Sequence, residues 1–270
     1  MQRRYVTVDV FTDRAFGGNQ LAVVLDAQGL STAQMQAIAV EFNYAETTFV
    51  LAKEAAKPPA RLKFEEGAGL VPLEILTQGG KVVGAELTAP QPLKRMTEAS
   101  AEQAAACISL SAADIRTDRQ APQIISVGMP FLVTELTSRE ALRKAKPNAD
   151  AFARVFPVDG AFAIYFYTRD VPPGEKPCDL QARMFFPALS GLTEDPATGS
   201  ATVALAALLA DLDPARDGEL RLRIGQGFDM GRPSVLLTRV VKQGGKIITA
   251  HVGGGCVTMM EGTFHLQGEG

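Results

Sequence analysis

The chain has 270 residues, of which 46% are hydrophobic and 21% are charged, and its formal net charge is −3. This length and composition suit one large domain or two smaller ones and exclude an intrinsically disordered chain. The weak negative charge gives no electrostatic reason to bind nucleic acid or an acidic membrane surface. No apolar run approaches the roughly 18–20 residues of a transmembrane helix, so we expect no membrane segment.

The amino terminus and the cysteines bear on location and on metal binding. The first residues, Met1–Asp9, are basic but lead straight into a strand pattern without the apolar core of a signal peptide, so we expect a cytoplasmic protein. Cys107, Cys178 and Cys256 are odd in number and lack Cys-x-x-Cys spacing, which argues against a disulfide framework and against a zinc site. Cys107 lies in an alanine-rich stretch and is predicted to be core.

The first predicted elements are two strands and a helix. Arg4–Phe11 alternates as a strand does, and a second strand is expected at Ala22–Leu25. The spacing of apolar residues predicts a helix over Thr32–Phe42, and Ser31 and Gln34 form a capping box at its start.

Glu46 lies at the entrance to an apolar strand. This strand, predicted at Thr47–Leu51, is β-branched and aromatic, and the helix residue Phe42 precedes the glutamate. A carboxylate between apolar flanks should have a pKa raised by desolvation, which a general acid or base needs near neutral pH. From these residues alone, an exposed glutamate at a strand end is an equally good interpretation.

The middle of the chain predicts a hairpin, a helix and a linker. The hairpin is expected from Leu73–Leu76 and Lys81–Leu87, and the helix from Thr97–Leu110. The polar segment Ser111–Pro122 is the predicted linker. We therefore expect an N-terminal half over residues 1–117 and a C-terminal half over residues 118–270.

The second half is predicted to be mostly strands. A short helix is expected at Ser138–Lys144 and a long exposed loop at residues 169–177. The predicted strands are Gln123–Val127, Phe131–Leu136, Phe162–Tyr167, Leu180–Phe185, Glu219–Gln226, Ser234–Val241, Lys246–Val252 and Val257–Met260.

A stretch of small residues, Glu194–Thr202, precedes a run of alanines and leucines that predicts a buried helix. Pro196 suits the first helical turn, where its missing N–H costs nothing. Thr198–Ser200 would then leave backbone N–H groups free at the positive end of the helix dipole, which is typical of an anion site with Asp195 beside it. The alternative is a capped core helix with Asp195 or Thr198 as N-cap.

Four further features have structural interpretations. Gly253–Gly255 precedes a strand and so lacks the context of a dinucleotide site, and a bulge or a close backbone approach is expected there. Arg232 could bind a carboxylate, but a structural arginine is favoured, and His251 is expected to be packed or at a sheet edge. Gly17–Asn19 forms a turn between strands or lines a ligand site, where Asn19 is a candidate substrate-binding residue with both a donor and an acceptor.

Short motifs are spread along nearly the whole chain. In chain order they are Asp9-Val10-Phe11-Thr12, Gly17-Gly18-Asn19-Gln20-Leu21-Ala22-Val23-Val24, Asn43-Tyr44-Ala45-Glu46-Thr47, Glu65-Glu66-Gly67-Ala68-Gly69, Gly128-Met129-Pro130, Ala182-Arg183-Met184-Phe185-Phe186-Pro187, Asp195-Pro196-Ala197-Thr198-Gly199-Ser200-Ala201, Gln226-Gly227 and Met230-Gly231-Arg232-Pro233. With these motifs the chain resembles the phenazine-biosynthesis isomerase family, the PhzF-like proteins. The motifs around Glu46 and Asp195 are specific together and weak alone.

The resemblance implies an α/β (α+β) fold of the diaminopimelate-epimerase type, in which each of two similar halves wraps a curved, mostly antiparallel sheet around a central helix. It also implies a homodimer and an active site in the cleft between the halves. The implied chemistry is isomerisation of a small carboxylic acid by proton transfer, without a cofactor. By motif, Glu46 is the proton-shuttling acid/base, Asp195 lies across the cleft, and Gly199 and Ser200 help hold a substrate carboxylate. Related racemases carry cysteines at the two acid positions, so a one-base proton shift is expected here rather than two-thiol racemisation.

One family motif is absent from the chain. Family members carry Gly-His-Pro at the start of the first half's central helix, but neither His251 nor His265 precedes a proline. The chain runs from Leu51 to Phe64 without this element, which implies an underfilled first half with an exposed apolar sheet face. A degenerate protein that binds small acids without turnover, a different substrate and a missing stretch of the natural chain are the open interpretations. A hydrolase acting through Ser200 is disfavoured, because this serine is not in a Gly-x-Ser-x-Gly turn.

Overall fold

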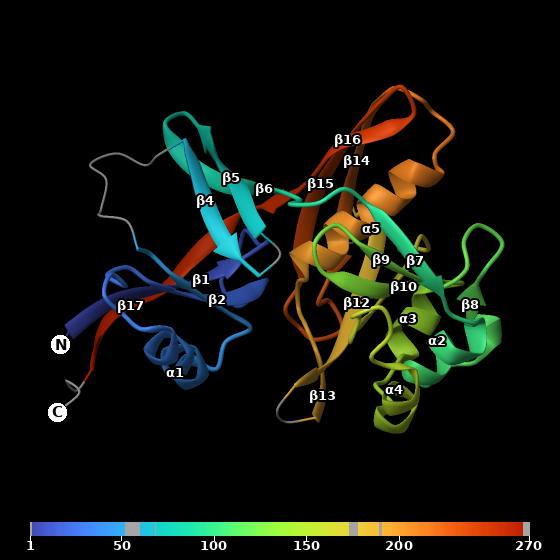
Figure 1. Ribbon diagram of the computed structural model, residues 1–270, viewed down its shortest axis with the longest axis horizontal. Coiled ribbons are helices and arrows are strands. Elements are labelled where there is room, and N and C mark those ends of the chain that lie inside the picture. Colours follow the sequence, from blue (N-terminus) through green and yellow to red (C-terminus); the bar gives the residue numbers. More distant parts are fainter. Residues whose placement is uncertain (1, 52–59, 68, 173–177, 189–190, 267–270) are drawn as a thin grey trace.

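The computed structural model describes residues 2–51, 60–67, 69–172, 178–188 and 191–266. Their strands form a sheet of four strands and a sheet of thirteen. The first described strand pairs with the last one in the small sheet, where Gln2 is opposite His265, while helix α5 (Gly199–Leu212) lies against the large sheet (Figure 1). Among the described residues, no helix is long and apolar enough to cross a bilayer.

The small sheet carries the first three motifs. Its strands, in spatial order, are β17 (Cys256–His265), β1 (Gln2–Val10), β2 (Asn19–Val24) and β3 (Glu46–Phe49). Strand β1 is antiparallel to β17 and β2, and β3 runs parallel to β2. Helix α1 (Thr32–Phe42) makes the crossover from β2 to β3, and its start has the predicted capping box of Ser31 and Gln34.

The two faces of the small sheet differ in burial. Val24 packs with Ile38 of α1, so the face that holds Val24 is the covered face. Leu21 is an odd number of residues away on the same strand and therefore lies on the opposite face. Glu46 pairs directly with Leu21 across β2 and β3, so its side chain also lies on the face away from α1.

The large sheet joins strands from both halves of the chain. Its main path is β4 (Arg61–Glu66), β5 (Gly69–Gln78), β6 (Lys81–Thr88), β16 (Lys246–Gly254), β15 (Ser234–Gln243), β14 (Gly218–Gln226), β12 (Leu180–Ala188), β11 (Ile164–Thr168), β10 (Pro130–Leu136), β9 (Gln123–Ser126) and β7 (Lys94–Glu98). Two short strands lie off this path, β13 (Gly191–Glu194) on β12 and β8 (Ile115–Arg116) on β10.

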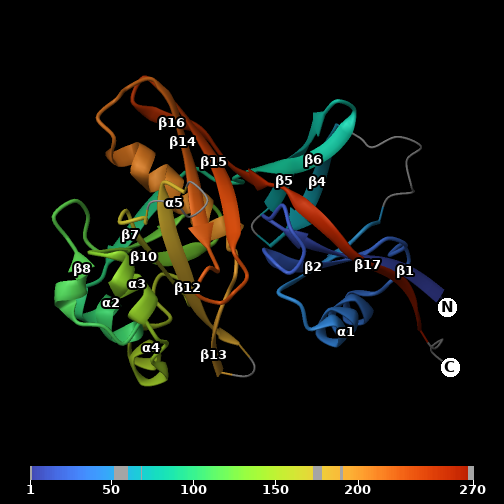
Figure 2. The ribbon, with the colours of Figure 1, turned by 180° about the vertical axis from the view of Figure 1, so that it is seen from behind.

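Two antiparallel pairings tie the end of the chain to its beginning. Strand β16 pairs with β6, and β17, which follows β16 directly, pairs with β1 (Figure 2). Strands β7 and β8, which precede residue 118, pair with β9 and β10, which follow it. Strand pairing therefore crosses the predicted boundary between residues 117 and 118, and that boundary stays a prediction.

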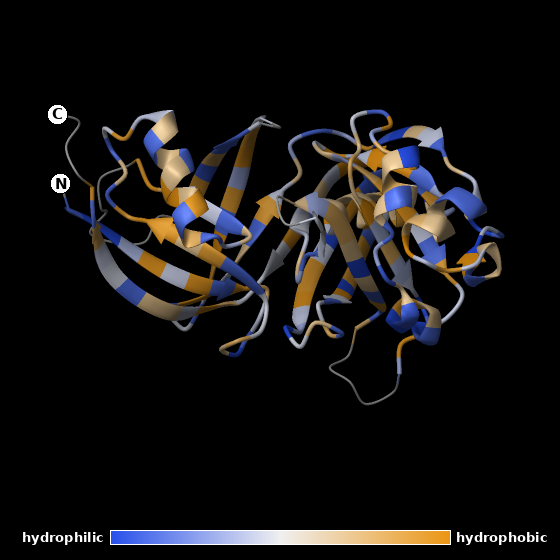
Figure 3. Ribbon diagram, turned by 90° about the horizontal axis from the view of Figure 1, so that it is seen from below, coloured by the Kyte–Doolittle hydropathy of each residue, from blue (hydrophilic) through white to orange (hydrophobic). Residues whose placement is uncertain are grey.

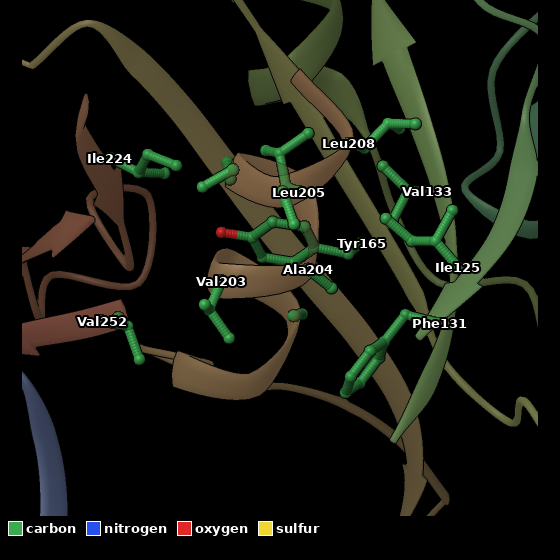
Figure 4. Close-up of a cluster of buried hydrophobic side chains, with 14 of the residues drawn as sticks. Ile125, Phe131, Val133, Tyr165, Val203, Ala204, Leu205, Leu208, Ile224 and Val252 are labelled. Carbon is green, nitrogen blue, oxygen red and sulfur yellow. The ribbon is translucent and has the colours of Figure 1, made fainter. Parts of the chain in front are cut away.

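The larger core surrounds α5. Ten consecutive residues of this helix, Ala201–Ala210, are buried, so the helix is covered on all sides. Figure 4 shows Tyr165 of β11 next to the helix, and the Tyr165 hydroxyl lies 2.8 Å from Thr202 Oγ1. The predicted buried helix is confirmed by this packing, although it begins at Gly199, so Pro196 lies in the preceding loop rather than in the first turn.

A second core lies under three short helices on the other side of the large sheet. These helices are α2 (Ala101–Cys107), α3 (Arg139–Lys144) and α4 (Ala149–Val155), with a 3-10 turn, η1 (Ala112–Asp114), after α2. Cys107 is fully buried in this cluster, which confirms its predicted core position. Figure 3 shows how hydrophilic and hydrophobic residues alternate along the strands and helices.

The predicted helix over Thr97–Leu110 is wrong in its first part. Residues 94–98 form β7, which pairs with β9, and Thr97 donates its backbone N–H to Asp159 Oδ2 at 2.8 Å. The helix starts only after Ser100, whose capping box with Gln103 marks the true beginning. Pairing with a distant strand overrides the local helical pattern here.

One further loop prediction needs correction, and two other segments are described only in part. The segment Ser111–Pro122 was expected to be a linker, but it contains η1 and β8, so it is part of the second-half fold. The predicted loop at residues 169–177 and the region between Leu51 and Phe64 fall partly outside the described residues, at 173–177 and 52–59. Helix α4, strand β4 and strand β13 have no counterpart among the predicted elements.

Candidate functional site

Glu46 is the first residue of β3, at the entrance to the strand as the sequence predicts. Water reaches its side chain, yet protein on several sides removes much of the bulk solvent around the carboxylate. This desolvation, followed by repulsion from Asp195 and from Glu66, raises the pKa of Glu46 to about 7. The residue is therefore both an exposed strand-end glutamate and a carboxylate with a raised pKa, and the two sequence interpretations are not exclusive.

Asp195 lies in the loop before α5 and is half-buried. Burial raises its pKa to about 6, even though hydrogen bonds from the Thr198 hydroxyl and the Ala197 backbone N–H lower it, and Glu194 adds repulsion. The Thr198 hydroxyl donates to Asp195 Oδ2 at 2.6 Å. These donors hold the carboxylate in place.

Glu46, at the start of β3, and Asp195, in the loop before α5, repel each other. Asp195 has the lower pKa, so it ionises first, and its negative charge is one cause of the raised pKa of Glu46. Near neutral pH, Asp195 is then mostly ionised while Glu46 is close to half-protonated. The structure thus places Glu46 and Asp195, which are 149 positions apart in the sequence, within electrostatic reach of each other.

Glu66, at the end of β4, is a third carboxylate near Glu46. Burial raises the pKa of Glu66, and its charge raises the pKa of Glu46. The sequence contained Glu66 within one of the motifs, but nothing in its spacing indicated that β4 would bring it toward β3. Among the described residues, no three His, Cys, Asp or Glu side chains come together as a set of metal ligands.

Gln226 is hydrogen-bonded to the loop that contains Asp195, a role that was not predicted from the sequence. Its side chain is fully buried, and its Nε2 donates to the Asp195 carbonyl at 2.8 Å and to Thr198 Oγ1 at 3.0 Å. Its Oε1 accepts the Thr198 backbone N–H at 3.0 Å. This last bond corrects the expected anion site, because the Thr198 N–H is already taken and only later donors of the helix start remain.

Gly199 and Ser200 begin α5, where no acceptor for their backbone N–H groups occurs among the described residues. No side chain caps the helix, so the positive end of its dipole is open. The Phe11 ring lies close by, because a Cβ added to Gly199 would be 3.3 Å from Phe11 Cζ.

Asn19 starts β2, two residues before Leu21, and so lies on the same sheet face as Glu46. It is only 3% exposed, and its Oδ1 has no hydrogen-bond partner among the described residues. A buried acceptor without a partner is costly, so the site gains from a donor supplied by a ligand or water. The preceding Gly18 has a φ of +63°, which makes Gly17–Asn19 a turn as well as a possible site wall.

The residues given structural interpretations have structural contacts. Arg232 donates to Asp9 and to two backbone carbonyls rather than standing open to a ligand. His251 packs in β16 with its Nδ1 3.1 Å from Thr88 Oγ1. Gly253 lies so close to the backbone of Ala85 that a side chain would collide with it, which confirms the expected close approach.

Comparison with known proteins supports one family along the chain. The model of the phenazine biosynthesis-like protein family matches residues 8–64 and 56–262. An uncharacterized isomerase of Mesorhizobium japonicum is 31% identical over 98% of this chain and 99% of that protein. A trans-2,3-dihydro-3-hydroxyanthranilate isomerase of Pseudomonas chlororaphis is 30% identical over 97% of this chain and 99% of that protein.

Solved structures agree on the fold. The crystal structure of a PhzF-family phenazine biosynthesis protein of Bacillus anthracis has a TM-score of 0.82 at 21% identity, covering 98% of this chain and 100% of that one. A hydroxyproline epimerase of Agrobacterium vitis has a TM-score of 0.57 at 12% identity, covering 97% and 91%. The predicted α/β fold class is thereby confirmed.

The family match is broken at one place. Its two pieces meet at residues 56–64, in the stretch where the Gly-His-Pro element would be expected. The alignment with the Mesorhizobium isomerase spans 304 positions, which exceeds the 270 residues of the chain by 34, so at least that many positions have no residue here. The named relatives support an isomerase of the PhzF type, shortened relative to them.

Proposed function

Because the chain belongs to the phenazine biosynthesis-like (PhzF) family, we propose that it is a cofactor-independent isomerase that moves a proton on a small carboxylic acid, with Glu46 as the acid/base. The observation that carries the proposal is a carboxyl group with a pKa of about 7 facing Asp195. A group that is half-protonated at neutral pH can both accept and donate a proton efficiently.

Each step of the proposed reaction has a residue to perform it. The substrate carboxylate binds the free N–H groups at Gly199 and Ser200, where the helix dipole favours negative charge. Ionised Glu46 removes a proton from one carbon, the double bond shifts, and protonated Glu46 returns the proton to another carbon on the same face. Asp195 remains ionised across the cleft, and its charge adds to the desolvation that raises the pKa of Glu46 to about 7. Asn19 Oδ1 accepts a hydroxyl or amino hydrogen of the substrate.

The substrate class follows from this arrangement and from the relatives. A one-base shift needs an acidic C–H next to an unsaturated bond, so we propose an unsaturated or hydroxylated small carboxylic acid. The Pseudomonas chlororaphis relative is named for a dihydro-hydroxyanthranilate, which is such an acid. That compound is therefore the first substrate to test. The homodimer, the cytoplasmic location and the division at residue 117 also remain part of this proposal.

The test is turnover of trans-2,3-dihydro-3-hydroxyanthranilate in D₂O by the wild type and by Glu46→Gln. We expect solvent deuterium in the wild-type product, and a rate lower by about 10²–10⁴-fold in the variant. The wild-type rate should rise with pH through about 7, as Glu46 ionises, and this titration should vanish in the variant. Glu41→Gln is the matched control, because Glu41 is an exposed glutamate near the end of α1. Full turnover by Glu46→Gln would show that the assignment is wrong.

A second candidate is a small-acid binding protein without turnover. It is favoured by one observation, the break in the family match at residues 56–64. It predicts that the acid binds at Gly199 and Ser200 but never acquires deuterium from solvent. Binding without exchange, measured by calorimetry and by mass spectrometry of the recovered acid, would favour it over the isomerase.

A further inference from the structure

Arg232 connects the loop after β14 to the small sheet by three hydrogen bonds. Its Nη2 donates to Asp9 Oδ1 at 2.7 Å and to the Gly17 carbonyl at 2.9 Å, and its Nε donates to the Gly18 carbonyl at 3.0 Å. The Asp9 side chain is only 5% exposed and the Arg232 side chain 22%. A planar guanidinium can bind three such acceptors at once because its donors are held in a rigid fork.

On one side, these contacts reach the strand that supports Glu46. Gly18 immediately precedes β2, and Asp9 pairs with the second residue of that strand from its place on β1. One residue further along, Leu21 is directly opposite Glu46 in the parallel pair of β2 and β3. Arg232 therefore binds near the end of β1 and the start of β2. Strand β2 in turn pairs with β3, which begins at Glu46.

On the other side, the loop of Arg232 contacts the loop of Asp195. The Ser234 hydroxyl is shared between the Arg232 carbonyl at 3.2 Å and the Pro196 carbonyl at 2.8 Å. The Arg232 backbone N–H donates to the Gly227 carbonyl at 3.0 Å, and a Cβ added to Gly227 would lie 2.6 Å from the Pro196 carbonyl. The Arg232 loop thus packs directly on the residue that follows Asp195.

We propose that Arg232 and Asp9 are a positioning pair that holds the supports of Glu46 and Asp195 at a fixed separation. The pair touches neither carboxylate, so it acts through the start of β2 and through the Pro196 backbone. The expected effect on the rate rests on the proposed function, in which Glu46 is the acid/base. A small misplacement of an acid/base can cost on the order of 10²-fold in rate. The expected effect on the repulsion between Glu46 and Asp195 does not rest on the proposed function, because this repulsion depends on their separation whether or not a substrate turns over.

The titration of Glu46 reports on this separation. The charged groups that act on Glu46 are Asp195 and Glu66, and Asp195 in turn faces Glu194, which is paired with Arg183 at 2.7 Å. If the supports move apart, both the repulsion from Asp195 and the desolvation decrease, so the pKa of Glu46 should fall from about 7 toward 4.5. A residue with only a structural role would lower the melting temperature and leave this pKa unchanged.

The experiment is a ¹³C NMR titration of the glutamate carboxyl groups in the whole protein, with Glu46 assigned by the signal that Glu46→Gln removes. Arg232→Lys keeps the charge but cannot make the three bonds, so we expect a lower pKa of Glu46 and a kcat about 10²-fold lower, with a smaller change in KM. Asp9→Asn keeps an acceptor for Arg232 and should give a smaller shift in the same direction. Asp9→Asn therefore provides a second test of the pair if Arg232→Lys does not fold.

Arg239→Lys is the matched control. Arg239 is also a partly buried arginine, 23% exposed and paired with Glu86, but it joins β15 to β6 without touching β2 or Pro196. We expect it to change stability while leaving the pKa of Glu46 at its wild-type value. An unchanged Glu46 titration in both Arg232→Lys and Asp9→Asn would overturn the positioning pair. A shifted titration in a protein that turns over no acid would instead leave the pair standing and overturn the proposed function.

Discussion

The small sheet with α1 and the large sheet with α5 are built on very different cores. Helix α5 has ten consecutive buried residues, whereas α1, with 11 residues, has only Ile38 buried. Around α1, the buried hydrophobic residues of the cluster are Val24, Ala27 and Ile38. Large apolar side chains remain exposed on the neighbouring strands β4–β6, namely Leu62, Leu70, Leu76, Val82 and Val83.

The two carboxylates of the site are supported in different ways. Asp195 stands at the start of a fully covered helix and is held locally by Thr198 and Gln226. Glu46 starts an edge strand of a thin sheet, where the local core fixes it much less. Contacts with the second half, such as those of Arg232, must therefore do more to place Glu46.

The largest expected effect is on stability. Leu205 of α5 is fully buried, so Leu205→Ala should cost about 2–5 kcal/mol, because it leaves a cavity among tightly packed neighbours. Ile38→Ala should cost about 2 kcal/mol, at the lower end of that range, because the partly buried neighbours of α1 can relax into the space. Urea denaturation of both variants at one pH measures the difference. Equal costs would contradict the contrast between the two cores.

Hydrogen exchange should show the same contrast without a mutation. The amides of Val203–Ala210 in α5 should exchange only through global unfolding, because the helix is buried on every side. The amides of α1 should exchange faster through local opening, because few apolar contacts hold this helix. Exchange followed by mass spectrometry of peptides from the two helices measures this directly. Slower exchange in α1 than in α5 would contradict the contrast between the two cores.

The smallest expected effect is the dependence of stability on pH. Glu46 keeps its proton up to a pH of about 7 in the folded protein but only to about 4.5 when unfolded, so stability is lost as the pH rises through this window. Glu46→Gln removes the loss and should melt higher than the wild type above pH 7 but not below 4.5. The gain should be modest because water reaches the side chain. Melting curves across this range, with Glu41→Gln as the control, measure it, and a difference that does not vary with pH would contradict it.

Local sequence patterns determined much of this protein because their physical causes are local. The capping box of Ser31 and Gln34 satisfies backbone donors within one turn, so the start of α1 could be predicted from four residues. A continuous run of alanine and leucine indicates a buried helix wherever it lies, and α5 is that helix. The position of Glu46 at a strand entrance was likewise predicted from its flanks, which left a raised pKa and an exposed strand-end glutamate as equal interpretations.

Only the tertiary structure decided which distant residues meet. The strand at residues 94–98 was predicted as helix because its partner β9 could not be known from local spacing. Gln226, Arg232 and Glu66 lie within motifs, but no local pattern indicated what they contact, since those contacts join residues that are far apart in the chain. Periodicity reports which face of an element is apolar, but hydrogen bonds and charge interactions across the fold depend on how the elements pack.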